Sequence, residues 1–141
     1  MCSVDKYSGF YNPGGKFFQR EAEYMHEFYM RQALLLAREA AGAGEVPVGC
    51  VIVRDGVVVG RGRNRREEKQ SALSHAEVEA IAQANRALSS WRLEDCSLYV
   101  TLEPCPMCAG AILNARIRRV FFGARDRTMG ACGGVLNLYM E

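Results

Sequence analysis

The sequence predicts an α/β domain in which helices pack against a mixed β-sheet. Three observations lead to this prediction: helix-forming and strand-forming segments alternate along the chain, a two-residue turn joins the first two strands, and the later strand–helix–strand steps need parallel crossovers. The length of 141 residues is close to the most common size of one domain, and 49% hydrophobic residues supply its core. We therefore expect one domain.

The N-terminal part of the chain differs from the rest. Residues 1–24 mix aromatic residues with glycine and proline and follow no helical or alternating period, so we interpret them as an irregular N-terminal extension before a domain at 25–141. From Met25 an apolar stripe at helical spacing predicts a first helix that stops at Gly42. The stripe consists of Phe28, Met30, Ala33, Leu34, Leu36 and Ala37.

Strands and helices then follow in turn. The β-branched run 46–53 and the short run 57–59 flank Asp55-Gly56, a hairpin turn signal, so two antiparallel strands are expected there. The polar residues 64–74 predict a loop. The remaining expected elements are a helix at 75–88, a strand at 97–102, a helix at 106–115, a strand at 119–123 and a glycine-rich tail at 124–141.

Charge and cysteine content exclude several classes of protein. The 18 basic and 16 acidic residues leave a net charge of +2, which excludes a disordered polyelectrolyte. No apolar run approaches the ~18 residues that span a bilayer, and residues 1–10 do not resemble a signal peptide, so we expect a cytoplasmic protein without a membrane partner. In that compartment six cysteines are expected to be thiols or metal ligands rather than disulfides.

Two closely spaced cysteines form the core of a candidate metal site. Cys105 and Cys108 are three residues apart at a strand-to-helix junction, a spacing that lets both thiols bind one ion. This spacing alone leaves three explanations open: zinc ligation, a thioredoxin-type redox pair and coincidence. Pro106 favours a helix that begins directly after Cys105, and a helix N-terminus favours a thiolate in either of the first two cases.

The segment His75-Ala76-Glu77 favours zinc over the other two explanations. One imidazole and two thiolates make three protein ligands, so the fourth position of a tetrahedral zinc ion stays open for water. A zinc ion lowers the pKa of a bound water toward neutrality. A fourth protein ligand would make the site structural instead. The cysteines that would provide it are Cys50, Cys96 and Cys132.

Glu77 is the candidate proton carrier. Deamination of an aromatic amidine needs a hydroxide at carbon and protons at a ring nitrogen and at the leaving amine, so one carboxylate must stand beside the metal. Glu77 lies two residues from His75, close to the metal yet at a different angle. A lone glutamate at a helix N-terminus more often only stabilises the helix dipole. The neighbouring ligand pattern favours the catalytic interpretation here.

These motifs resemble a known family. His75-Ala76-Glu77 followed by Pro104-Cys105 and Cys108 is the signature of the zinc deaminases. The segments 45–49, 62–65, 101–111 and 122–126 resemble the bacterial tRNA-specific adenosine deaminases in order and spacing, over about residues 25–138. The resemblance implies a three-layer α/β/α cytidine deaminase-like fold with a mixed central sheet. It also implies that His75, Cys105 and Cys108 bind Zn²⁺ and that Glu77 donates the proton.

The resemblance further implies a substrate and partners. The expected reaction is hydrolytic deamination of adenosine to inosine at the wobble position of a tRNA anticodon, and the expected assembly is a homodimer that binds the anticodon stem-loop. The substrate-binding residues that it implies are Glu45, Asn64, Ala76 and Asp126. Two arginine groups, at 61–66 and 116–127, are candidate phosphate contacts or an ordinary solvated surface. The alternatives are a deaminase of free guanine or cytosine and an inactive zinc-binding partner subunit.

The sequence also departs from the family pattern. It stops at Glu141, before the final strand and helix that family members add, so we expect these elements to be absent and the domain to be short at its C-terminal end. The strand at 119–123 is then expected at an exposed edge, with an uncovered apolar face at Val120, Phe121 and Phe122. The segment 71–74 before His75 also differs from the common family loop.

Overall fold

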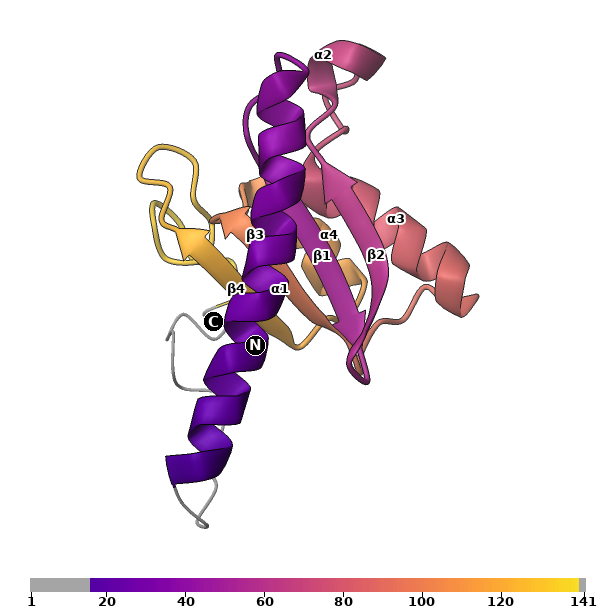
Figure 1. Ribbon diagram of the computed structural model, residues 1–141. Helices are drawn as coiled ribbons and strands as arrows, with labels where there is room; N and C mark the ends of the chain where they lie inside the picture. Colours follow the sequence, from indigo (N-terminus) through magenta and orange to yellow (C-terminus); the bar gives the residue numbers. More distant parts are fainter. Residues whose placement is uncertain (1–15, 140–141) are drawn as a thin grey trace.

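The computed structural model describes residues 16–139, with side chains from residue 23 onward. A four-stranded sheet in the order β2-β1-β3-β4 lies between α1 on one face and α3 and α4 on the other (Figure 1). The elements are α1 (Lys16–Gly42), β1 (Gly49–Arg54), β2 (Val57–Arg63), α2 (Arg66–Lys69), α3 (Ala76–Leu88), β3 (Ser97–Leu102), α4 (Pro106–Asn114) and β4 (Arg119–Ala124). This is the mixed α/β sheet that the sequence predicts.

Helix α1 begins earlier than expected. Residues 16–24 are helical, so the expectation of an irregular segment was wrong for them, while residues 1–15 lie outside the described residues. No glycine or proline occurs between Gly15 and Gly42, and nothing therefore interrupts the helix once it has begun. Among residues 16–139 no helix is both long enough and apolar enough to cross a bilayer.

The buried face of α1 consists mostly of small residues. Ala33, Ala37 and Ala40 are buried together with Tyr29, whereas Phe28 and Leu34 of the predicted stripe are 43% and 45% exposed. The reason is the close approach of α1 to β1: a Cβ added to Gly49 would collide with the carbonyl oxygen of Ala33. Large side chains have no room at this contact and lie on the solvent side of the helix.

The strand pairing agrees with the predicted connections. Strand β1 pairs antiparallel with β2 and with β3, and β3 pairs parallel with β4 across the α4 connection. The hairpin turn has the left-handed conformation that its sequence predicts, with φ of 50° at Asp55 and 75° at Gly56. The segment 64–74, predicted as a loop, contains the single-turn helix α2.

Two core layers hold the helices on the sheet. Cys50 and Ile52 of β1 face α3 and α4, whereas Val51 and Val53 face α1. Helix α3 lies close to β2 because glycines face it: a Cβ on Gly62 would collide with the carbonyl oxygen of Ala76. This contact places the first turn of α3 beside the end of β2, near the end of β3 and the start of α4.

Strand β4 lies at an edge of the described sheet, as expected. Its side chains are nevertheless covered, so the expected bare apolar face was wrong for two of its residues. Val120 is 1% exposed, and the ring of Phe121 stacks on Tyr99 at 4.8 Å and lies 4.3 Å from the ring of His26. His26 of α1 covers Phe121, whereas Val120 packs in the core layer that faces α3 and α4.

Candidate active site

Three side chains that could hold a metal ion meet where two helices begin. His75 is the N-cap residue of α3, Cys105 is the N-cap residue of α4, and Cys108 lies in the first turn of α4. The Nδ1 atom of His75 is 3.6 Å from Sγ of Cys105 and 3.5 Å from Sγ of Cys108. Residues 30 positions apart in the sequence thus form one cluster, whose ligand atoms all lie within 4.8 Å of one another.

The cluster fits a tetrahedral zinc ion. Bonds of about 2.1 Å to nitrogen and 2.3 Å to sulfur at a tetrahedral angle separate the two ligand atoms by about 3.6 Å. The two N···S distances agree with this value. Among the described residues the group has only these three members, so Cys50, Cys96 and Cys132 do not close the site. Burial also raises the pKa of Cys50, which keeps that thiol neutral.

The two thiols of the cluster differ in acidity without a bound ion. The pKa of Cys105 is lowered to about 5, first because its thiolate accepts a hydrogen bond from the Cys108 thiol and further because of the charge of His75. The pKa of Cys108 is raised because it donates that bond and is buried. One sulfur is therefore already in the form that binds a metal.

Metal removal is expected to make Cys105 the most reactive of the described cysteines. At pH 7 a thiol with a pKa of about 5 is almost fully ionised, whereas the other four are buried. Alkylation by iodoacetamide, mapped by mass spectrometry of peptides, should be at least about tenfold faster at Cys105 than at Cys132 after chelation. Added Zn²⁺ should suppress it. Equal labelling of Cys105 with and without Zn²⁺ would contradict its role as a ligand.

Glu77 lies beside this cluster in the first turn of α3. Its side chain is buried, and burial raises the pKa of its carboxyl group above the ordinary value. The charge of Cys105 acts in the same direction, whereas a hydrogen bond with Cys108 and the charge of His75 oppose it. A buried carboxyl group with a raised pKa suits proton transfer near neutral pH.

Asn64 lies at the end of β2, close to His75. It is 6% exposed, and its Oδ1 atom accepts the backbone N–H of Arg66 at 2.9 Å. The backbone N–H of Arg65 donates to the carbonyl of Ser74 at 2.9 Å. This bond ties the Asn64 segment to the residue before His75, and the Asn64 amide keeps its NH₂ group as a donor.

The carboxylate of Glu45 holds the same segment from the other side. Glu45 is 7% exposed, and its two oxygens accept the backbone N–H groups of Glu67 at 2.9 Å and Glu68 at 3.0 Å. Both oxygens are thus bound to the first turn of α2. This geometry suits a residue that orders the Asn64 segment rather than one that contacts a substrate directly.

The other two predicted substrate-side residues lie around the cluster. Ala76 is fully buried between His75 and Glu77. Asp126 follows β4, and its Oδ1 atom accepts hydrogen bonds from the backbone N–H of Thr128 at 2.9 Å and of Met129 at 3.1 Å. Bonds from Thr128, first that of its hydroxyl, lower the pKa of Asp126 below its ordinary value. The carboxylate therefore caps its own turn.

The arginines near Asn64 are partly neutralised within the chain. Arg63 donates to Glu68 at 3.1 Å and Arg65 donates to the other oxygen of Glu68 at 2.8 Å. Arg61 and Arg66 are exposed. Glu68 thus binds two of the four guanidinium groups in the segment 61–66, the first of the two arginine groups predicted as candidate phosphate contacts.

Two further features had no place in the sequence prediction. Glu103, directly before Pro104-Cys105, is a buried carboxylate that accepts backbone hydrogen bonds from the tail. The sequence signal that could have identified Glu103 was an acidic residue between a strand and a candidate metal ligand.

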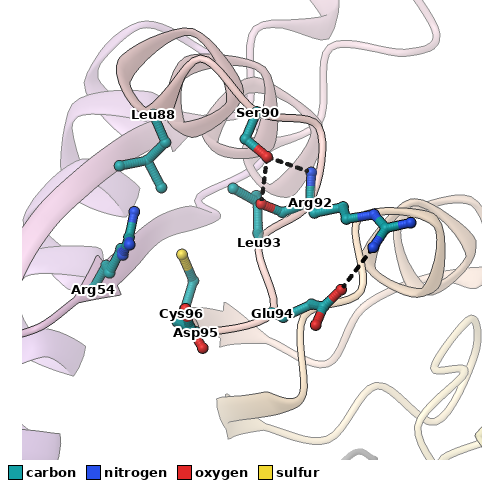
Figure 2. Close-up of a pocket in the computed structure, with 8 residues that line it drawn as sticks. All are labelled: Arg54, Leu88, Ser90, Arg92, Leu93, Glu94, Asp95 and Cys96. Carbon is teal, nitrogen blue, oxygen red and sulfur yellow. Dashed lines mark hydrogen bonds and ion pairs between the residues drawn. The ribbon is translucent and has the colours of Figure 1, made fainter.

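A separate pocket, which Arg54, Arg92 and Cys96 help to line, lies at the opposite end of β3 (Figure 2) and shares no residue with the cluster. The catalytic candidate is therefore the cluster.

Comparison with known proteins shows which family this chain resembles. A family model described as MafB19-like deaminase matches residues 24–138. A tRNA-specific adenosine deaminase of Bacillus subtilis (strain 168) is 48% identical over 115 residues, which are 82% of this chain and 71% of the relative. A chloroplastic tRNA(adenine(34)) deaminase of Arabidopsis thaliana is 48% identical over 121 residues, 86% of this chain but only 9% of that longer protein.

Solved structures agree with these relatives. A structure from work on A-to-I editing by tRNA:A34 deaminases at the wobble position of transfer RNA has a TM-score of 0.74 and 48% identity, and the match covers 76% of this chain and 82% of that one. A guanine deaminase from Bacillus subtilis has a TM-score of 0.69 and 44% identity, with 71% and 64% covered. The chain belongs to the deaminase family that includes the tRNA-specific adenosine deaminases.

Proposed function

We propose that this protein is a zinc-dependent hydrolase that converts adenosine to inosine at the wobble position of a tRNA anticodon. The observation that carries the proposal is the cluster of His75, Cys105 and Cys108 with the buried Glu77 beside it. The 48% identity to a tRNA-specific adenosine deaminase supports the choice of substrate. The net reaction consumes one water and releases one ammonia.

The residues of the site divide the chemistry between them. Zn²⁺ held by His75, Cys105 and Cys108 supplies Lewis acidity, which lowers the pKa of water toward neutrality. Glu77 takes one proton from the attacking water and passes it to the ring nitrogen of adenine. It then takes the second proton, from the hydroxyl group now bonded to the ring carbon, and gives it to the leaving amine, so that ammonia departs as the carbonyl forms. Its burial supports this role, because burial raises the pKa of the carboxyl group and so makes it a better proton acceptor than an exposed glutamate.

The adenine itself is held by the residues around the metal. Asn64 donates a hydrogen bond from its amide to the base, since its Oδ1 atom is already bound to the backbone of Arg66. Ala76 packs in the core next to His75 and Glu77 and supports the site from within, and Glu45 and Asp126 order the segments on either side. A target base in this site must leave its stack, which favours the single-stranded loop of an anticodon over a duplex.

We place the reaction in the cytoplasm and in a homodimer. The five cysteines in the described part of the chain form no disulfide with one another, which is typical of a reducing compartment. Large apolar side chains are half exposed along the tail, a pattern typical of a surface that a second copy covers. They are Met129, Val135, Leu136 and Leu138. Light scattering at micromolar concentration measures the molar mass of the assembly, and the mass of a monomer would contradict the proposed homodimer.

The test of the proposed function compares RNA with free bases. The zinc-loaded chain should form inosine in an anticodon stem-loop with adenosine at the wobble position, detected by mass spectrometry after nuclease digestion. It should leave free guanine and free cytosine unchanged. Xanthine formed from guanine would favour the second candidate, a guanine deaminase, to which the structure with 44% identity points. A zinc-loaded chain that deaminates none of these substrates would favour the inactive partner subunit.

A further inference from the structure

A buried carboxylate lies next to the metal ligands and takes no part in the chemistry proposed above. Glu103 is 2% exposed and follows the last residue of β3. Its Oε1 atom accepts the backbone N–H of Asp126 at 3.3 Å, and its Oε2 atom accepts those of Cys132 at 3.0 Å and Gly134 at 2.8 Å. Three backbone dipoles thus compensate a charge that would be costly to bury alone.

The three donors belong to one segment, residues 125–134, called here the tail loop. Two of its glycines make room for the carboxylate. A Cβ added to Gly130 would collide with Oε2 of Glu103, and a Cβ added to Gly134 would lie 2.7 Å from both carboxylate oxygens. The tail loop is therefore folded around this one side chain.

The tail loop is also joined to the metal site. The backbone N–H of Ala131 donates to the carbonyl of Pro104 at 2.9 Å, directly before the ligand Cys105. Figure 1 shows the loop, in yellow, beyond the end of β4. On its outer side Arg125, Arg127 and Met129 are exposed, and guanidinium groups beside an apolar side chain suit the phosphates and bases of RNA.

We propose that Glu103 is a positioning residue whose carboxylate holds the tail loop beside the metal site, where the loop forms a wall that binds the RNA flanking the target adenosine. This inference rests on the proposed function. Among the described residues, the hydrogen bonds of the Glu103 carboxylate all run to the backbone of the tail loop. Glu103 acts through the backbone of the loop, because three N–H groups lose their common acceptor when the carboxylate is removed.

The first measurement is hydrogen exchange in the zinc-loaded protein. Glu103→Gln keeps the side-chain size but replaces one acceptor oxygen and the negative charge with an NH₂ group, so at least one of the amides of Asp126, Cys132 and Gly134 loses its acceptor and should exchange at least tenfold faster. The core amides of Val51 and Val100 and the zinc content should not change. Glu39→Gln, an exposed glutamate on α1, is the matched control and should leave all rates unchanged. Unchanged exchange in the tail loop would overturn the proposal.

The second measurement is the effect on RNA. Glu103→Gln should raise KM for the anticodon stem-loop about tenfold and leave kcat within about threefold, because it moves a binding wall and not the reacting groups. Gly134→Ala displaces the same carboxylate from the other side and should reproduce both effects if Glu103→Gln folds poorly. A faster-exchanging loop with unchanged KM would overturn the role in RNA binding.

These readouts separate this inference from the proposed function. A wild-type chain that loads zinc but leaves the stem-loop adenosine intact would contradict the proposed function and, with it, the RNA-binding half of the inference. The exchange rates do not depend on RNA and decide by themselves whether Glu103 orders the tail loop.

Discussion

Replacement of Glu77 by alanine is expected to lower kcat for the anticodon stem-loop by at least two orders of magnitude while one zinc ion per chain is retained. General acid–base groups typically contribute about 10² to 10⁴ to the rate. Glu77 is buried beside the ligands without belonging to the cluster, so its loss removes proton transfer and leaves the three metal-binding atoms in place. Single-turnover inosine formation and metal analysis of the same preparation measure both quantities.

Two further variants make this result specific. Glu77→Gln keeps the shape of the buried side chain and should be as inactive as Glu77→Ala, which excludes a cavity as the cause. Glu79→Gln removes a carboxylate from the same helical turn that is paired with Lys69 at 2.8 Å, and it should keep nearly wild-type activity. If Glu77→Ala lost its zinc together with its activity, Glu77 would be a ligand or a structural support instead.

Replacement of Gly62 by alanine is expected to destabilise the protein strongly and to disturb the metal site. The added Cβ would collide with the carbonyl oxygen of Ala76 and lie 2.7 Å from the backbone nitrogen of Ala80. Backbone atoms in a packed helix cannot swing aside, so α3 must move away from β2 and take His75 with it. Overpacking of this kind costs about 3 kcal/mol, which lowers Tm by about 10 °C for a domain of this size.

Gly110→Ala is the matched control for this substitution. Gly110 lies in α4, two residues after Cys108, and a Cβ there meets no atom within 4 Å. Alanine in an open helix position should raise stability by up to about 1 kcal/mol and leave zinc binding unchanged. Thermal unfolding followed by circular dichroism, with zinc content measured in parallel, compares the two variants. A Gly62→Ala protein with wild-type Tm and zinc content would show that α3 does not depend on this close contact.

Local signals in the sequence were sufficient for most of the sheet and for the three residues that meet in the His75–Cys105–Cys108 cluster. The strand at 97–102 and the helix that starts at Pro106 lie where predicted, because the strand-forming residues Tyr99, Val100 and Thr101 and a proline at the first helical position act within a few residues. The candidate ligands His75, Cys105 and Cys108 were recognisable for the same reason. Their residue types and spacing reflect the chemistry of the ion and need no knowledge of the surrounding packing.

Only the tertiary structure decided which surfaces pack and which carboxylates are used for anchoring. The stripe from Phe28 to Ala37 predicted a large apolar face for α1, but Gly49 brings α1 so near the sheet that alanines form the contact. Glu45 was expected to bind the substrate, and Glu103 had no predicted role. Their partners are backbone N–H groups more than 20 residues away, and every residue except proline offers such a group. A sequence pattern therefore cannot specify these bonds, whereas the folded chain brings each carboxylate to one set of donors.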